Sequence, residues 1–417
     1  MRMRIACPRA FDRVWGGTEA SQLEAPAGYG MDTMDVDQLI AWDSLLKEDE
    51  KMVRSSVRRF VRERCMPRIV GDYEAGRFAT ELIPELAKLG LLGANLEGYG
   101  CAGMGSTAYG LACHELEACD SGLRSFVSVQ TSLAMYAIWR YGSEAQKEKW
   151  LPEMAAGKAV GCFGLTEPEH GSDPASMETR AVRSQDGWSL SGRKLWITNA
   201  QIAHLAVVWA RGPDGIVGFI VERDRPGFAS GDIPHKLSMR ASVTGALYLD
   251  EVKLREDSRL PRADGLKAPL SCLDNARFGV AFGVLGAARA CLEQAIAYTR
   301  ERKQFGVPVA SKQLVQSELA DIASEVVKAS LLSLHYARLK EQGKLAPVQT
   351  SLLKRNNCRI ALDAARRSRA LLGANGVAGD FHVMRHAANL ESTFTYEGTD
   401  QIHTLSIGRA LTGLAAF

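Results

Sequence analysis

Apolar positions recur at helical spacing in two parts of the chain, one near each end. In the first part, from about residue 34 to residue 157, Val53, Val57 and Val61 are four residues apart and so share one face of a helix. In the last part the helical pattern returns after Pro269, and one run ends at a Gly-Ala-Asn-Gly turn, a typical helix terminator. Both ends of the chain are therefore predicted to be helical.

The segment between them, from residue 160 to about residue 262, has the period of strands. Apolar and polar positions alternate on both sides of Asp186-Gly187, and apolar runs flank Asp214-Gly215. Asp-Gly between such runs is typical of a β-hairpin. This segment predicts a small antiparallel β-domain.

The order helical, β, helical contains no βαβ alternation and predicts a mainly α fold with a β-domain in the middle. A ligand held between the domains is expected, because pockets commonly form there. The predicted division is a poorly ordered N-terminal segment 1–34, an N-terminal helical domain 35–159, a middle β-domain 160–265 and a C-terminal helical bundle 266–417.

Composition is that of a globular protein, with 417 residues, 46% of them hydrophobic and 24% charged. This length predicts two or three core regions. The net charge of +3, with no block of Lys and Arg, argues against nucleic-acid binding. No apolar run approaches the roughly 18 residues that span a bilayer, so we expect no membrane segment.

The cysteines and the N-terminus bear on the cellular compartment. The nine cysteines are scattered and none forms C-x-x-C, which argues against a disulfide framework or a zinc site and favours a reducing compartment. The N-terminus has arginines but no apolar core of a secretory signal. We expect a cytoplasmic protein in a bacterium and a mitochondrial matrix protein in a eukaryote.

Two motifs that resemble known sites lack the context those sites need. Gly98–Gly103 matches G-x-G-x-x-G, but a helical segment precedes it and no βαβ unit follows, so a dinucleotide fold is not predicted. His382 and His386 are four residues apart without the glutamate of H-E-x-x-H or an evident third ligand. We therefore predict no metal site.

Other stretches could line a ligand, although each also has a structural explanation. CFGLTEPEHGSDPASM, at 162–177, is an irregular loop with hydroxyls and backbone N–H groups that suit a polar ligand, but an ordinary turn explains it equally well. In KLWITNA a tryptophan stands beside small polar residues, which fits either a ring cofactor or a core. The arginines of RERKQFG suit a pyrophosphate or the C-terminus of a helix.

Five motifs, CFGLTEPEHGSD, KLWITN, RKQFG, LLGANG and TYEGTDQIH, together resemble the acyl-CoA dehydrogenase family from about residue 40 to the C-terminus. Within it, HELEACDSGLRSFVSVQ, LKRNNC, DNARFG and Tyr396 are most similar to the glutaryl-CoA dehydrogenases. The resemblance implies FAD as cofactor, an acyl-CoA substrate, an electron-transferring flavoprotein as electron acceptor, and a homotetramer.

The same resemblance implies a set of binding residues. The residues expected to hold FAD, partly across a subunit interface, are Phe163, Leu165, Thr166, Ser172, Trp196, Ile197, Thr198, Arg302, Phe305, Gln313, Gly373, Ala374, Thr399 and Gln401. The residues expected to contact the acyl-CoA are Glu117, Arg124, Ser125, Ser128, Ser172, Asn275, Arg277, Tyr396 and Gly398, with the CoA portion held by Asn275 and Arg277.

Composition and periodicity explain Glu397 equally well as a solvated surface acid, but the resemblance implies that it is the catalytic base. The α-proton of an acyl thioester is weakly acidic, so a base must act together with stabilisation of the enolate. Burial would raise the pKa of this carboxyl. The β-hydrogen would then leave as a hydride to the flavin.

Arg124 stands in a stretch that is otherwise almost free of charge. A buried guanidinium can bind a carboxylate through two parallel hydrogen bonds, and the resemblance implies that Arg124 binds the distal carboxylate of glutaryl-CoA. Ser128 is one turn further on, and Glu117, seven residues earlier, lies on the same face if the helix is continuous. Tyr396 and Glu117 resemble the members that decarboxylate their product to crotonyl-CoA.

Other interpretations of these residues remain open. Arg124 could form a structural ion pair with Glu117 or Asp120 instead of binding substrate. Leu123 stands where the family resemblance predicts an aromatic residue, which leaves a different dicarboxylyl or short-chain acyl-CoA, or a dehydrogenase that does not decarboxylate. A non-catalytic flavin-binding protein is a third alternative, against which the presence of Glu397 argues.

Overall fold

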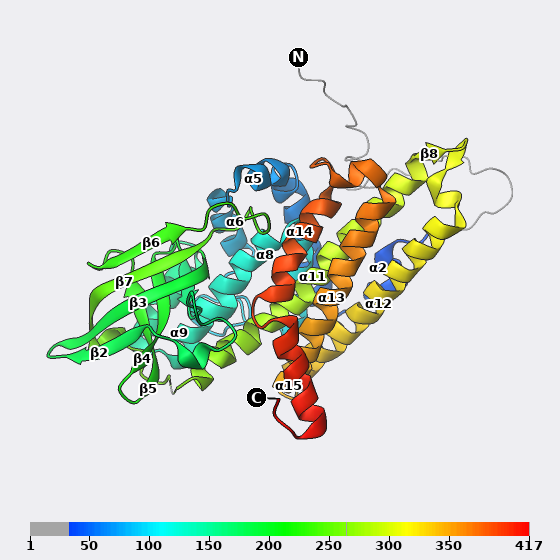
Figure 1. Cartoon of the computed structure of the whole chain (residues 1–417). Coiled ribbons are helices and arrows are strands. Elements are labelled where there is room, and N and C mark those ends of the chain that lie inside the picture. Colours follow the sequence, from blue (N-terminus) through cyan, green and yellow to red (C-terminus); the bar gives the residue numbers. More distant parts are fainter. Residues whose placement is uncertain (1–32, 264, 417) are drawn as a thin grey trace, which may run out of the picture.

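The computed structural model describes residues 33–263 and 265–416. It has helices at both ends of the chain and one sheet between them, which confirms the predicted fold class (Figure 1). The predicted N-terminal segment 1–34 lies outside the described residues except for its last two positions. In Figure 1 the sheet lies at one end of the molecule, and the long C-terminal helices extend away from it.

The N-terminal helices surround one long buried segment. Every residue from Ser121 to Met135 is buried, which explains why this stretch carries so little charge. Asp120 has an extended backbone and its side chain caps the helix that follows, so Glu117 and Arg124 lie on two helices and not on one. The elements are α2 (Val36–Ile40), α3 (Trp42–Leu45), α4 (Glu48–Phe60), η1 (Val61–Cys65), α5 (Ile69–Ala75), η2 (Thr80–Leu82), α6 (Ile83–Lys88), α7 (Ser106–Cys119), α8 (Ser121–Ser128), η3 (Val129–Met135), α9 (Tyr136–Tyr141) and α10 (Glu144–Ala155).

The middle segment forms a seven-stranded sheet in the order β1-β4-β2-β3-β7-β6, with β5 on β4. Both predicted hairpins are present, because Ser184 pairs with Gly187 and Gly212 pairs with Gly215. Contrary to the purely antiparallel expectation, β1 and β2 each pair with β4 in parallel. The elements are β1 (Gly161–Gly164), η4 (Pro174–Ser176), β2 (Arg180–Ser184), β3 (Gly187–Thr198), β4 (Leu205–Gly212), β5 (Gly215–Glu222), β6 (Phe228–Asp232), β7 (Thr244–Arg255) and η5 (Glu256–Ser258).

The C-terminal segment is a bundle in which α11 packs against α13 and against α7 of the N-terminal part. Part of α11 is long and apolar enough to cross a membrane, contrary to our expectation, but 78% of that window is buried inside the protein. Its apolar character is therefore that of a core helix. The elements are α11 (Lys267–Glu301), β8 (Lys303–Gln304), β9 (Val307–Pro308), η6 (Val309–Ser311), α12 (Gln313–Glu341), α13 (Pro347–Leu371), η7 (Gly373–Val377), α14 (His382–Thr395) and α15 (Asp400–Thr412).

Three buried hydrophobic clusters agree with the prediction of two or three core regions. The largest joins the N-terminal helices to the C-terminal bundle, with Leu116 and Phe282 among its members. A second lies between η3 and the sheet and includes Leu133 and Phe163. The third lies within the sheet. The first two clusters hold the N-terminal helices to the bundle and to the sheet.

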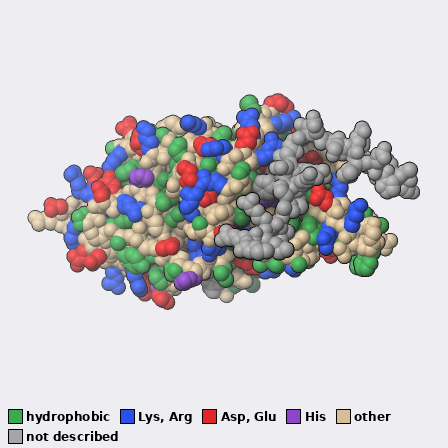
Figure 2. All heavy atoms as spheres, turned by 90° about the horizontal axis from the view of Figure 1, so that it is seen from above, with side chains coloured by type: hydrophobic (Ala, Val, Ile, Leu, Met, Phe, Trp, Pro, Cys, Tyr) green, Lys and Arg blue, Asp and Glu red, His purple; other side chains and the backbone are tan. Residues whose placement is uncertain are grey.

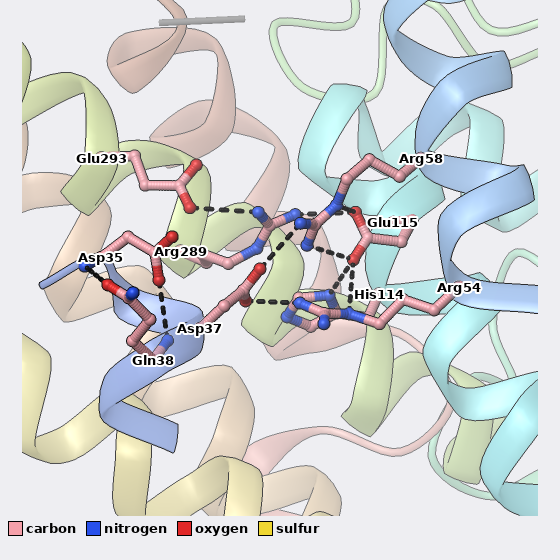
Figure 3. A network of polar contacts seen from close by, with 9 residues as sticks. All are labelled: Asp35, Asp37, Gln38, Arg54, Arg58, His114, Glu115, Arg289 and Glu293. Atoms are coloured by element: carbon pink, nitrogen blue, oxygen red, sulfur yellow. Dashed lines mark hydrogen bonds and ion pairs between the residues drawn. The ribbon is translucent and has the colours of Figure 1, made fainter. Parts of the chain in front are cut away.

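A buried ionic network links α2, α4, α7 and α11 (Figure 3). Glu115 is 1% exposed and accepts hydrogen bonds from Arg58 at 2.9 Å and Arg289 at 2.8 Å. Arg58 also pairs with Asp37 at 2.7 Å. Burial opposes ionisation of Glu115, but Arg289 and Arg58 hold its pKa well below the usual value. The network thus fixes the N-terminal helices to the central helix of the bundle.

On the face shown in Figure 2, basic and acidic side chains are interspersed. A surface of mixed sign agrees with the small net charge of +3. Among the described residues, no group of three or more His, Cys, Asp and Glu could hold a metal ion.

Glu115→Gln is predicted to destabilise the protein by about 3 kcal/mol, because Arg58 and Arg289 lose the buried carboxylate that they share. Urea unfolding of the holoenzyme measures this change. Glu48→Gln is the control, since Glu48 pairs with Lys51 but its side chain is 89% exposed. Equal stability of the two variants would contradict a structural role for the network.

Candidate active site

A cavity of about 590 Å³ lies where the sheet meets α8, η3 and the connection between α14 and α15. Its walls are mostly apolar with a few hydroxyls and carboxyls, a composition typical of small-molecule sites. The predicted residues that line it are Ser125, Phe163, Leu165, Thr166, Ser172, Trp196, Ile197, Thr198, Tyr396, Glu397, Gly398 and Thr399. The structure thus brings together motifs that are far apart in the sequence.

Glu397 stands in a sharp turn between α14 and α15. Its φ of 53° and that of Gly398, 90°, are both in the left-handed region, which is strained for a residue with a side chain. A Cβ at position 398 would lie 2.8 Å from Nε2 of His403, so only glycine fits there. On the other side of the turn, the side chain of Thr399 caps α15.

The carboxyl group of Glu397 is in an environment that suits a base. Its Oε2 atom is buried without a hydrogen-bond partner in the described structure. Burial raises the pKa of this carboxyl, and the charges of Arg124, Arg277 and Lys354 oppose the rise. A carboxylate with a raised pKa on an apolar wall can take a proton from a bound ligand.

Arg124 lies fully buried behind Tyr396 and is not itself on the cavity wall. Its Nε atom donates to Glu117 at 2.6 Å, and its Nη2 atom donates to the hydroxyl of Tyr396. The alternative ion pair with Glu117 is therefore present. The Nη1 atom of Arg124 and the hydroxyl of Ser128 are buried without a hydrogen-bond partner in the described structure. Such atoms are unfavourable unless something binds them.

A glycine makes room for this buried pair. A Cβ on Gly283 of α11 would lie 2.3 Å from Oε2 of Glu117 and 3.1 Å from Arg124. The absence of a side chain at position 283 therefore lets α11 pack directly against the ion pair.

Arg277 lies beside the turn at Glu397 and Gly398. Its Nε atom donates to the carbonyl of Glu397 at 2.9 Å, and its Nη1 atom donates to Asp274 at 2.6 Å. Asn275 is buried, and its Oδ1 atom accepts a hydrogen bond from Nδ2 of Asn95 at 3.4 Å. The contact of Asn275 and Arg277 with the CoA portion stays a prediction.

Several of the residues predicted to bind cofactor or substrate do not line the cavity. Phe305 is 92% exposed beside the β8–β9 hairpin, and Figure 1 shows β8 at the end of the bundle away from the sheet. Gln401 is exposed in the first turn of α15. The predicted residues outside the cavity wall are Glu117, Arg124, Ser128, Asn275, Arg277, Arg302, Phe305, Gln313, Gly373, Ala374 and Gln401.

The structure adds a loop that no sequence motif indicated. Lys236 donates to the carbonyls of Met239 at 3.1 Å and Ser242 at 2.7 Å, and the N–H of Met239 donates to Asn389 of α14 at 2.7 Å. These contacts hold the loop over the cavity. The lining residues not predicted are Val129, Leu133, Gly171, Pro174, Lys236, Leu237, Ser238, Met239, Thr244, Leu273, Glu391, Ser392 and Thr395.

The cavity wall formed by the sheet fits the flat ring of a flavin. Trp196 is 58% exposed, with a left-handed φ of 62° that turns it out of the regular strand. An exposed indole on a cavity wall is unfavourable in water and favourable against a planar ring. Thr166, Thr198 and Ser172 offer hydroxyl groups on the same wall.

Three domain models of one protein family match most of the described chain. Residues 47–158, 162–252 and 263–412 match the N-terminal, middle and C-terminal domains of acyl-CoA dehydrogenase. The chain belongs to the acyl-CoA dehydrogenase family. Members of this family depend on FAD, which confirms the predicted cofactor, and are oxidoreductases that act on CH–CH bonds of acyl-CoA.

Solved structures of this family are similar over nearly the whole chain. Glutaryl-CoA dehydrogenase from Mycobacterium smegmatis is 56% identical, with a TM-score of 0.91 over 92% of this chain and 100% of that one. A second structure of a glutaryl-CoA dehydrogenase from that organism, 53% identical, is a complex with FADH2. A chain described as the electron transferring flavoprotein of Acidaminococcus fermentans is 32% identical, with a TM-score of 0.85 over 88% of this chain and 98% of that one.

Sequence relatives include enzymes named as specific for short-chain acyl-CoA. The short-chain specific acyl-CoA dehydrogenase of Megasphaera elsdenii is 34% identical over 84% of this chain and 95% of its own length. The family and its acyl-CoA chemistry are therefore established, whereas its members differ in the acyl group that they oxidise.

Proposed function

We propose that this enzyme oxidises glutaryl-CoA and decarboxylates the product to crotonyl-CoA and CO2. The observation that carries the proposal is the buried Arg124, whose Nη1 atom has no hydrogen-bond partner in the described structure. The 56% identity to a glutaryl-CoA dehydrogenase supports it. A cation behind Tyr396 offers the distal carboxylate of the substrate a partner that a simple acyl chain cannot use.

In this proposal Glu397 takes the α-proton of the bound thioester. FAD, when bound, supplies the acceptor for the hydride that leaves the β-carbon. The apolar wall around Glu397 excludes water, and its raised pKa lets it hold the proton afterwards. Loss of CO2 from the unsaturated product leaves a dienolate, to which protonated Glu397 returns its proton to give crotonyl-CoA.

Tyr396 and Glu117 have supporting roles in this proposal. Burial raises the pKa of Tyr396 despite the charge of Arg124, and burial also raises the pKa of Glu117. Tyr396 therefore stays neutral, and its hydroxyl, which already accepts from Arg124, holds the guanidinium near the turn. Glu117 orients the guanidinium from the opposite side.

The alternative is a dehydrogenase of short-chain or other dicarboxylyl acyl-CoA that does not decarboxylate. Two observations favour it: Arg124 is already paired with Glu117, and the M. elsdenii relative is specific for short chains. A non-catalytic role is a weaker alternative, because Glu397 is present on the cavity wall.

For the assembly, we propose a homotetramer in which FAD extends from one subunit to the next. The support is that β8, which Arg302 and Phe305 flank in the chain, lies at the end of the bundle away from the sheet (Figure 1). Phe305, 92% exposed, would then be covered by cofactor and partner. We propose an electron-transferring flavoprotein as the electron acceptor.

A panel of acyl-CoA thioesters tests the proposed reaction. Glutaryl-CoA is expected to be consumed, with crotonyl-CoA and CO2 identified by mass, both with a ferrocenium acceptor and with purified electron-transferring flavoprotein. Turnover of butyryl-CoA without formation of crotonyl-CoA from glutaryl-CoA would contradict the substrate assignment. Accumulation of glutaconyl-CoA would support the non-decarboxylating alternative.

Variants of Arg124 test whether this residue selects the substrate. Arg124→Gln is expected to lower kcat/KM for glutaryl-CoA by about 100-fold relative to butyryl-CoA, because a charge-assisted pair is lost. Since this variant leaves Glu117 buried alone, Arg124→Gln with Glu117→Gln separates that penalty from substrate binding. Equal losses on both substrates would mean that the arginine is structural.

The assembly is tested by Phe305→Ala. Because FAD is expected to cross the subunit interface, this variant should lose FAD on dilution although position 305 is far from the cavity. Flavin absorbance after gel filtration with light scattering measures both properties. Leu411→Ala, at a residue 81% exposed, is the control, and a monomer that retains FAD would contradict the proposed tetramer.

A further inference from the structure

The turn at Glu397 and Gly398 is held by a second buried cation, Lys354, to which the sequence analysis gave no role. Lys354 lies on α13 and is 1% exposed. Its ammonium group donates to the carbonyl of Gly398 at 2.8 Å. In sequence it belongs to LKRNNC, 43 residues before Glu397, and nothing in the helical pattern distinguishes it from a surface lysine.

A buried ammonium is costly unless it is well compensated. The neighbouring acid Asp400, at the start of α15, is bound instead by Arg359 at 2.5 Å and lies 3.7 Å from Arg355. Burial lowers the pKa of Lys354, whereas Cys358 and Glu397 oppose that change. The carbonyl of Gly398 and the charges of Glu397 and Asp400 therefore offset part of the cost of burying this ammonium.

The strained backbone of the turn requires contacts that hold it in place. Two consecutive residues with positive φ persist only where their surroundings hold them. Arg277 holds the carbonyl of Glu397 from α11, and Lys354 holds the carbonyl of Gly398 from α13. Each carbonyl of the turn thus has its own cation from a different helix.

We propose that Lys354 is a positioning residue for Glu397, which fixes the left-handed turn through Gly398 and adds a positive charge that favours the ionised base. This inference rests on the proposed role of Glu397 in proton abstraction. Lys354 acts through the turn and touches neither the substrate nor the cofactor in this account.

The charge of Lys354 acts on Glu397 together with its other neighbours. Burial holds the pKa of His403 at about 3, so this side chain stays neutral. Loss of the ammonium takes away one of the charges that lower the pKa of Glu397, and the pKa must rise. The charged and titratable groups around the turn are Glu117 on α7, Arg124 on α8, Arg277 on α11, Lys354 and Cys358 on α13, Tyr396 in the turn, and Asp400 and His403 on α15.

The test compares Lys354→Met and Lys354→Gln with the wild-type holoenzyme, using the acyl-CoA that it oxidises fastest. We expect Lys354→Met to lower kcat by about 100-fold, the cost of misplacing a catalytic group, with KM changed by less than threefold or so. The ascending limb of kcat against pH should move to higher pH. Lys354→Gln keeps a donor for Gly398 and should recover part of kcat while sharing the pH shift.

Arg355→Gln is the matched control, because Arg355 is the next residue on α13 and its Nε donates to Thr404 at 2.7 Å instead of the turn. Its pH profile should match that of the wild type. Wild-type kcat and pH profile in both Lys354 variants would overturn the proposal, as would losses that follow FAD content and equal those of Arg355→Gln.

Two further variants keep the outcome decisive. If Lys354→Met does not fold as a holoenzyme, Lys354→Arg, which keeps a cation and a donor, must show the wild-type pH limb; a folded Lys354→Arg with a shifted limb would overturn the proposal. Glu397→Gln is measured in parallel. If Glu397→Gln is active, the proposed role of Glu397 as base is refuted. If Glu397→Gln is inactive but the Lys354 variants keep the wild-type kcat and pH profile, only the proposed role of Lys354 is refuted.

Discussion

The left-handed turn at Glu397 and Gly398 is the constraint on which the active site depends. A glutamate with a φ of 53° is strained, and its neighbours must hold it in place. Arg277 from α11, Lys354 from α13 and the start of α15 meet at this turn. Glu397, which lies in no helix itself, is therefore held at the cavity wall by contacts from three helices.

The helices that support the turn are held together by contacts outside the cavity wall. Glu115 and its arginines fix the N-terminal helices to α11, and Gly283 lets α11 pack closely against the Glu117–Arg124 pair. Buried charge thus recurs along α7 and α11, in each case with oriented partners. Burial opposes ionisation at each carboxyl, yet the pKa falls at Glu115 and rises at Glu397, because the charges of two bound arginines at Glu115 outweigh burial.

Much of the fold was predictable because periodicity and turns are local. The two Asp-Gly hairpins and the helix over Pro347–Leu371 follow from short-range patterns. The break at Asp120 was missed, since its extended backbone depends on capping and on contacts to Arg385 and Asn389 of α14. Of the site, the motif residues on the cavity wall were found. The loop at Lys236 and the buried Lys354 were not, because only tertiary packing distinguishes them from surface residues.

Exchange of the substrate α-proton with solvent most directly tests whether Glu397 is the base. The holoenzyme is incubated anaerobically with acyl-CoA in deuterium oxide, and the recovered substrate is analysed by mass spectrometry. The wild type and Glu391→Gln, which alters another carboxyl on the cavity wall, should incorporate deuterium at the α-carbon. Glu397→Gln should exchange about 1,000-fold more slowly. Exchange at the wild-type rate in Glu397→Gln would contradict the account.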